Sequence, residues 1–192
     1  HPDRDEQWKQ EELGRIGEER FRREYGCEFL VFDETLVNSI VLSTLEGIQP
    51  IVNMGQTRWY KKMDPQKTYV VSLDPAMGTG GDNAAIQVVE LPTFEQVAEW
   101  KHNTTAIPQQ IRILRDICTH IKEETQSTGS NIYWSVENNT IGESALLVIN
   151  DFGEENIPGM FVSEPIRKGH IRKFRKGFNT THRTKISACA RL

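Results

Sequence analysis

Two acidic residues each close an apolar, strand-like run of the chain. Asp74 ends the run Tyr69-Val-Val-Ser-Leu, and Glu137 ends the run Ile132-Tyr-Trp-Ser-Val. A carboxylate at the end of a buried strand is costly unless it is paired or binds a metal. If the two strands lie side by side in a parallel sheet, the two carboxylates meet. Such a pair suits Mg²⁺ or Mn²⁺ and the cleavage of phosphodiester bonds, so both residues are predicted to be catalytic metal ligands.

Each of these acids also has a simpler interpretation. Asp74 precedes Pro-Ala-Met-Gly, where an aspartate commonly caps a turn. Glu137 could be an exposed strand end that pairs with a lysine. The polar residues Asn138 and Asn139 that follow it suit the rim of a metal site. The recurrence of the same pattern on two strands favours the metal-binding interpretation.

A glycine-rich turn follows Asp74 and ends on a further acid, Asp82. Its glycines, Gly78, Gly80 and Gly81, permit positive φ and a close approach of the backbone to a phosphate. Asp82 is a candidate third metal ligand or could orient a metal-bound water. It could equally stabilise a tight hairpin, for which glycines are needed in any case.

Positive charge is concentrated at the end of the chain. The net charge is −4, yet residues 165–192 hold nine Lys or Arg and no acid. This asymmetry favours contact with a polyanion, and the absence of base-reading residues favours contact with the backbone of double-stranded DNA, independent of sequence. A merely solvated tail is the alternative. The predicted DNA-binding residues are Arg167, Lys168, Arg172, Lys173, Arg175, Lys176, Arg183 and Lys185.

The composition fits a globular protein, with 37% hydrophobic and 26% charged residues in a chain of 192. No apolar run approaches the length of a membrane span, so no membrane partner is expected. The three cysteines are far apart and lack the spacing of a metal site.

The first third of the chain is predicted to be separate from the main domain. Residues 1–25 are highly charged and fit a helix with a narrow apolar stripe. Residues 27–33 are predicted to form a strand and 40–44 a short apolar element. Residues 49–67 hold two prolines and no clear period, which indicates a linker.

The remainder predicts the element order βββαβαβα. The strands are expected at 68–74, 84–90, 94–102, 131–137 and 160–164, and the helices from Ile107, at 142–150 and at 182–192. Three strands in a meander followed by α/β crossovers are typical of an α/β, ribonuclease H-like mixed sheet flanked by helices. In that fold the first and fourth strands are neighbours.

The first of these helices has clear boundary and face signals. Thr105 is a plausible N-cap, and Pro108 falls in the first turn, where its missing N–H costs little. One apolar face is predicted to be buried, formed by Ile111, Leu114, Ile117, Cys118 and Ile121.

Taken together, these features resemble the nuclease domain of the large terminase subunit of tailed bacteriophages, of the contractile-tail type. The resemblance rests on Asp74 with the glycine turn to Asp82, on Glu137-Asn138, and on Arg183-Thr184-Lys185 at a helix start. It spans about residues 26–192. It implies a two-metal endonuclease that cuts concatemeric viral DNA at the start and end of head filling.

The same resemblance implies a larger machine. Residues 1–66 would be the end of an ATPase motor region and its linker, and 67–192 a nuclease domain truncated at its C-terminus. A third acidic ligand would then lie beyond Leu192, and this fragment would cut poorly. The portal and the small terminase subunit would be partners, in the cytoplasm of the infected bacterial host.

Two other functions remain open from the sequence. Asp-x-x-x-Gly-Thr-Gly is similar to the phosphate-gripping hairpin of sugar and acetate kinases, which would make the chain a phosphotransferase or ATPase. That fold normally needs two such domains. A non-catalytic DNA-docking module, with the acids only capping strands, is the third possibility.

Overall fold

The computed structural model describes residues 6–17, 21, 44–168 and 171–190, without the side chains of Ile16, 166–168 and 171–173. The chain forms two compact units, residues 1–47 with 189–192, and residues 48–188. In the first unit, helix α1 (Glu6–Ile16) lies within the predicted 1–25 helix. The predicted strand at 27–33 and residues 40–43 of the predicted apolar element lie outside the described residues.

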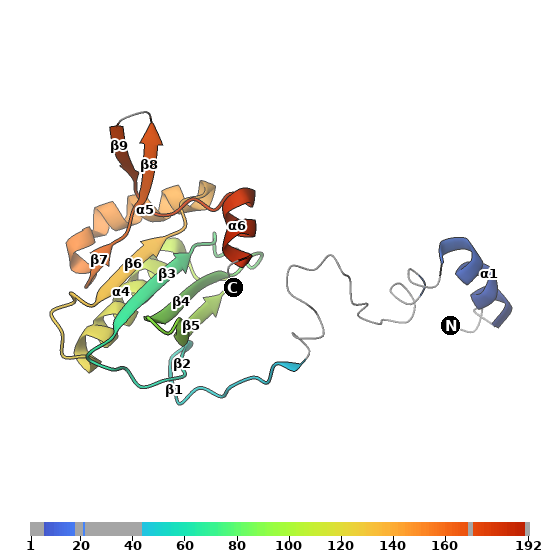
Figure 1. Cartoon of the computed structure of the whole chain (residues 1–192), viewed down its shortest axis with the longest axis horizontal. Coiled ribbons are helices and arrows are strands. Elements are labelled where there is room, and N and C mark those ends of the chain that lie inside the picture. The colour runs from blue at the N-terminus through green and yellow to red at the C-terminus, as the bar shows by residue number, and fades with distance from the viewer. Residues whose placement is uncertain (1–5, 18–20, 22–43, 169–170, 191–192) are drawn as a thin grey trace. The chain divides into compact units, whose positions relative to one another are not determined.

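The second unit is built on a seven-stranded mixed sheet (Figure 1). The strands follow the order β1-β2-β5-β4-β3-β6-β7 across it. β4 is antiparallel to both β3 and β5, whereas β6 is parallel to β3 and β7 is parallel to β6. The bounds are β1 Val52–Met54, β2 Thr57–Trp59, β3 Thr68–Asp74, β4 Ala84–Leu91, β5 Glu95–His102, β6 Ile132–Val136 and β7 Met160–Phe161.

This arrangement is the predicted ribonuclease H-like fold. The three-strand meander β3-β4-β5, the crossover to β6 and the adjacency of β3 and β6 are all present. β3 has the predicted bounds, Thr68–Asp74. The sheet therefore brings together the two strands whose ends carry the candidate ligands.

Helices α4 (Ile107–Glu124) and α5 (Thr140–Phe152) pack against one face of this sheet (Figure 1). Strand residues alternate between faces, and β3 buries Tyr69, Val71 and Leu73 toward the helices. Burying each such side chain contributes roughly 1.5–3 kcal/mol. The core is thus continuous from the sheet to the helices.

No helix in the described part of the chain is long and apolar enough to span a bilayer.

The opposite face of the sheet is polar at its centre. Ser72 of β3 is paired with Gln87 of β4 on one side and with Ser135 of β6 on the other. The three side chains are exposed or half-buried. A cavity of about 990 Å³ lies along this face.

The N-terminal end of α4 differs from its prediction in one detail. The N-cap is Ala106, which makes no side-chain cap bond. Thr105 is not the cap, because its hydroxyl is hydrogen-bonded to Nδ1 of His102 at 2.6 Å. Pro108 in the first turn is confirmed, and so is the buried face formed by Ile111, Leu114, Ile117, Cys118 and Ile121.

The linker predicted at 49–67 is wrong for residues 52–59. β1 and β2 lie there, and β2 pairs with β5 through Arg58 and Trp59. Trp59 is buried in the core. Strands of three residues are too short to show a period, and long-range pairing stabilises them, so the sequence pattern missed them.

The basic segment forms a hairpin that the sequence did not predict. β8 (Glu164–Lys168) and β9 (Ile171–Arg175) pair as a separate two-stranded sheet. The predicted strand at 160–164 is therefore wrong at its end, because β7 stops at Phe161.

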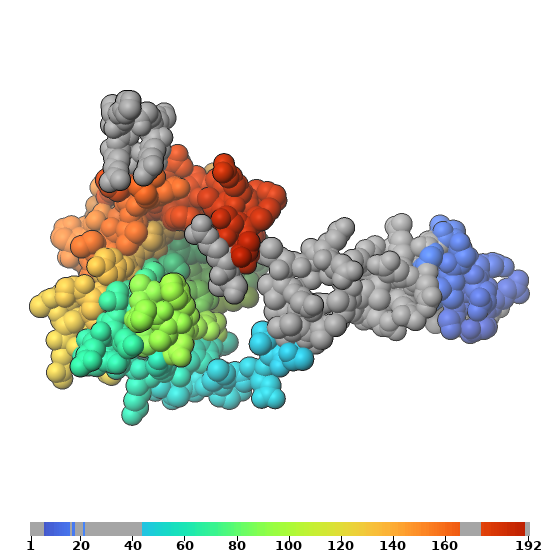
Figure 2. Space-filling view, in the orientation of Figure 1, coloured from blue at the N-terminus to red at the C-terminus, as the bar shows by residue number. Residues whose placement is uncertain are grey.

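Helix α6 (His182–Cys189) starts at the predicted residue and lies on the surface, where Figure 2 draws it in red. At its start the hydroxyl of Thr181 accepts a bond from the Thr184 N–H at 3.2 Å. The hydroxyl of Thr184 accepts one from the Thr181 N–H at 2.8 Å. This reciprocal cap fixes where the helix begins.

Candidate active site

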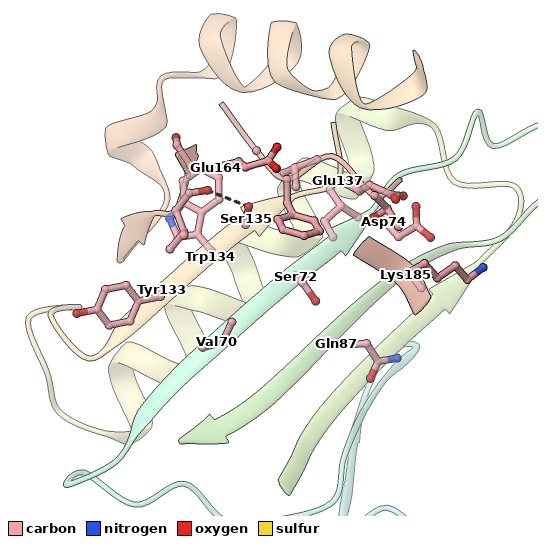
Figure 3. A pocket seen from close by; sticks show the side chains of 18 of the residues that line it. Val70, Ser72, Asp74, Gln87, Tyr133, Trp134, Ser135, Glu137, Glu164 and Lys185 are labelled. Atoms are coloured by element: carbon pink, nitrogen blue, oxygen red, sulfur yellow. Dashed lines mark hydrogen bonds between the residues drawn. The ribbon is translucent and has the colours of Figure 1, made fainter. Parts of the chain in front are cut away.

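Asp74 and Glu137 meet at the same edge of the sheet. The parallel register of β3 and β6 ends at the pair Leu73 and Val136. One more bond follows it, from the Glu137 N–H to the Leu73 carbonyl at 2.8 Å. The sheet geometry therefore places Glu137 beside the last residue of β3, Asp74. Figure 3 shows the two side chains together above the end of β3.

The pKa of Asp74 reflects both the burial of its carboxyl and the closeness of Glu137. Burial of its carboxyl is the largest cause of a pKa raised to about 6. A hydrogen bond shared with Glu137 and the negative charges of Glu137 and Asp82 raise the pKa further. The Asp74 side chain as a whole is exposed, so the shielding is partial. Like charges crowded in this way favour a proton or a cation between them.

Asp82 lies at the far end of the loop that follows Asp74, and both residues line a second, smaller cavity. This cavity, of about 290 Å³, is also lined by Glu137, Asn139 and Thr140. Within the described part of the chain, no group of three or more His, Cys, Asp or Glu side chains is close enough to hold a metal. Asp82 as a third ligand therefore stays a prediction. Its charge nevertheless acts on Asp74.

The start of α5 closes the cavity from the Glu137 side. A Cβ at Gly142 would lie 1.9 Å from the Glu137 carbonyl oxygen, so only glycine lets the helix approach this closely. Asn139 is the N-cap of α5 but makes no side-chain cap bond. Its carboxamide is thus an additional polar group at the cavity, and the only sequence signal for it is its place two residues after the strand-end acid Glu137.

A segment from the basic stretch flanks Glu137 on the side away from β3. The Phe178 N–H donates to the Val136 carbonyl at 2.9 Å, and the Asn138 N–H donates to the Phe178 carbonyl at 2.7 Å. The Asn138 side chain donates to the Lys176 carbonyl at 2.8 Å. These bonds anchor residues 176–178 beside the acids, an arrangement that the sequence did not reveal.

The predicted DNA-binding residues fall into three groups. Arg167, Lys168, Arg172 and Lys173 have their backbones in the β8–β9 hairpin, and their side chains lie outside the described part of the structure. Arg175 is exposed at the end of β9. Lys176 is already engaged, because its Nζ lies 2.8 Å from Glu154 and 5.8 Å from the centre of the Phe161 ring.

Arg183 and Lys185 form the third group, in the first turn of α6. Lys185 lines the 990 Å³ cavity together with Asp74 and Glu137 (Figure 3). A cation and two carboxylates therefore border the same space. Neither carboxylate forms an ion pair within 4.0 Å among the described residues.

No protein-family model matches the chain, and no curated protein is similar to it. Among solved structures, it is similar to the large terminase nuclease from thermophilic phage G20c. For the form with bound zinc, the identity is 14% and the TM-score 0.43, over 59% of this chain and 58% of that one. A second structure of that nuclease gives 15% and 0.43, over 55% and 51%.

A form of that nuclease with bound magnesium gives 14% identity and a TM-score of 0.35, over 74% of this chain and 89% of that one. This chain spans little more than half the length of the first two structures, at 58% and 51%.

Proposed function

We propose that this chain carries a divalent-metal-dependent endonuclease site that cuts double-stranded DNA. The observation that supports it is the meeting of Asp74 and Glu137 at the ends of two adjacent parallel strands, on a cavity open to solvent. The described residues supply no cation within ion-pair distance of these acids, whereas a divalent cation would satisfy both carboxylates.

The donor set at this position fits Mg²⁺ or Mn²⁺. Both cations prefer oxygen ligands, and Mg²⁺ typically takes one or two carboxylates while it keeps several waters. Asp74 and Glu137 would hold the ion directly, and Asp82 and Asn139 would hold a second ion or orient waters across the cavity. The bound metal would generate hydroxide and stabilise charge on the attacked phosphate.

The protein groups around the acids suit a phosphate backbone. The first residues of α5, Thr140 to Gly142, line the cavity, and a helix N-terminus favours an anion. Lys185 borders the acids from α6, with Arg183 in the same turn. None of these groups selects a base, so cleavage would tolerate many sequences.

The wider setting follows from the sequence resemblance to large terminase subunits. The chain would act in viral genome packaging, cutting concatemeric DNA as heads fill. A motor domain of the same protein would precede the nuclease, with the portal and the small subunit as partners. The work would take place in the host cytoplasm.

A plasmid-cleavage assay tests the proposed site. The wild-type chain should nick or linearise supercoiled DNA with Mn²⁺ and leave it intact with EDTA. Asp74→Asn and Glu137→Gln keep the shape but remove a ligand charge. Since a metal supplies several kcal/mol and each 1.36 kcal/mol is tenfold in rate, each change should slow cleavage at least about a hundredfold.

Asp151→Asn serves as the matched control, because Asp151 is an exposed acid on α5 outside the cavity. Its cleavage rate should equal that of the wild type. If Asp74→Asn and Asp151→Asn behave alike, the acid pair is not the cutting site. DNA binding without any cleavage would indicate a docking module instead.

A further inference from the structure

Gln110 is the most deeply buried polar side chain near the candidate site. It lies on the first turns of α4 and is fully buried, at 0% exposure. Its Nε2 donates to the Ala76 carbonyl at 2.6 Å and to the Thr105 carbonyl at 2.7 Å. Its Oε1 accepts a longer bond from the Ala76 N–H at 3.4 Å. One carboxamide therefore binds both backbone groups of the residue two positions after Asp74.

The loop between β3 and β4 is held at a second place further along. The Gly80 N–H donates to the Asn103 carbonyl at 2.9 Å, and the Asn103 side chain donates to the Gly80 carbonyl at 3.0 Å. Gly78, at φ +72°, lies so close to the segment before α4 that a Cβ there would meet the Thr105 carbonyl oxygen at 2.3 Å. The loop is thus docked through Ala76, Gly78 and Gly80 on residues 103–106 and on Gln110.

We infer that Gln110 is a positioning residue. It fixes the loop that has Asp74 at one end and Asp82 at the other, and so sets how these acids face Glu137. This inference rests on the proposed function for its consequence, metal binding. Gln110 itself does not line the cavity of the acids. It acts through the backbone of Ala76.

Physical chemistry gives this role its expected size. A buried amide network is strong when every member is satisfied and costly when one partner is removed. Groups outside the ligand shell that orient ligands typically change metal affinity by about 10–100-fold when they are replaced. The three bonds of the Gln110 side chain are not part of the backbone bonding of α4, so α4 would remain a helix without them.

The test is Gln110→Met in the full chain, a change that keeps length and helix propensity but removes all three bonds. Two quantities are measured. Hydrogen exchange of the backbone amides of residues 76–82 should accelerate relative to the β-sheet. The Kd for Mn²⁺, measured by titration calorimetry without DNA, should rise at least about tenfold.

Thr125→Val is the matched control. Thr125 is also buried, at 3% exposure, but it is the C-cap at the far end of α4, where its hydroxyl donates to the Ile121 carbonyl at 2.7 Å. It should lower the melting temperature without changing loop exchange or Mn²⁺ affinity. A merely structural Gln110 would behave like Thr125, and that result overturns the inference.

Gly78→Ala tests the same docking without touching α4. The added methyl group would push against the Thr105 carbonyl and should reproduce both effects. If Gln110→Met does not fold, this variant decides. Faster loop exchange with an unchanged Mn²⁺ Kd would also overturn the positioning role. If the wild type binds no Mn²⁺, the proposed function fails, and the exchange rates alone decide whether Gln110 fixes the loop.

Discussion

The acidic residues near the two ends of strand β3 differ in whether the chain supplies a cation for them. Glu90 lies opposite Tyr69 near the start of β3, and it is buried, at 1% exposure. Its carboxylate is neutralised by Lys61, whose Nζ lies 3.1 Å away, and it accepts a bond from the Thr93 hydroxyl at 3.2 Å. At this end an acid is a structural element with its cation supplied by the chain.

The other end gathers acids without such a cation. Asp74, Glu137 and Asp82 border one cavity, and none of them forms an ion pair with a described residue. Burial of the Asp74 carboxyl raises its pKa, and the nearby negative charges raise it further. Acids at the two ends of one strand therefore differ in whether a described residue supplies a cation for them.

The largest expected effect is metal stabilisation at the Asp74 end. Mn²⁺ at a hundred times its Kd should raise the free energy of unfolding by about 2.7 kcal/mol, since it binds only the folded state. Asp74→Asn should abolish this gain, whereas Glu90→Gln should leave it intact. Denaturant unfolding with and without Mn²⁺ measures it. An equal gain in the wild type and in Asp74→Asn would place the metal elsewhere.

A second prediction concerns DNA, which only the Asp74 end should bind. Arg175→Gln, Arg183→Gln and Lys185→Gln together should lower the slope of log affinity against log salt by about 0.9 per lost phosphate contact. Fluorescence anisotropy over a salt series measures the slope. Lys61→Gln, at the opposite end, is the control. An unchanged slope in the triple variant would show that these cations are only solvated.

A third prediction concerns thermal stability at the Glu90 end, where the chain itself supplies the cation. Lys61→Met leaves the Glu90 carboxylate buried without its cation, so the melting temperature should fall by several degrees. Adding Glu90→Gln in the same chain should recover part of the loss, because the uncompensated charge is then gone. Thermal unfolding followed by circular dichroism decides. If the double variant is less stable than Lys61→Met alone, the Lys61–Glu90 ion pair is not what stabilises this end of the sheet.

The smallest effect, because solvent screens the exposed Asp74 side chain, is a pH dependence of stability at the Asp74 end. The folded pKa of Asp74 is about 6, above the ordinary value of about 3.9, so the folded state binds more protons between these values. In EDTA, wild-type stability should therefore fall as pH rises from 4 to 6. Urea midpoints of the wild type minus those of Asp74→Asn isolate this term. A flat difference would show that Asp74 titrates normally.

Prediction from sequence succeeded where local pattern and long-range structure agree. Alternating apolar residues set the bounds of β3, and apolar residues at helical spacing set the buried face of α4. The element order led to the adjacency of β3 and β6. It failed at β1 and β2, and at the β8–β9 hairpin, whose residues carry no strong period. Thr105 was taken for a cap because its type fits, yet it bonds to His102.

By itself, the sequence determined which acids end strands, because side-chain alternation is a local property. The element order predicted that those strands are neighbours, through the fold of which that order is typical. Only the tertiary structure decided which acid is neutralised. Glu90 and Asp74 each end or nearly end an apolar run, and neither run shows which of the two acids has a cation. The difference arises because Lys61, distant in the chain, reaches Glu90, whereas the Asp74 loop is docked on Gln110 and no described residue forms an ion pair with its acids.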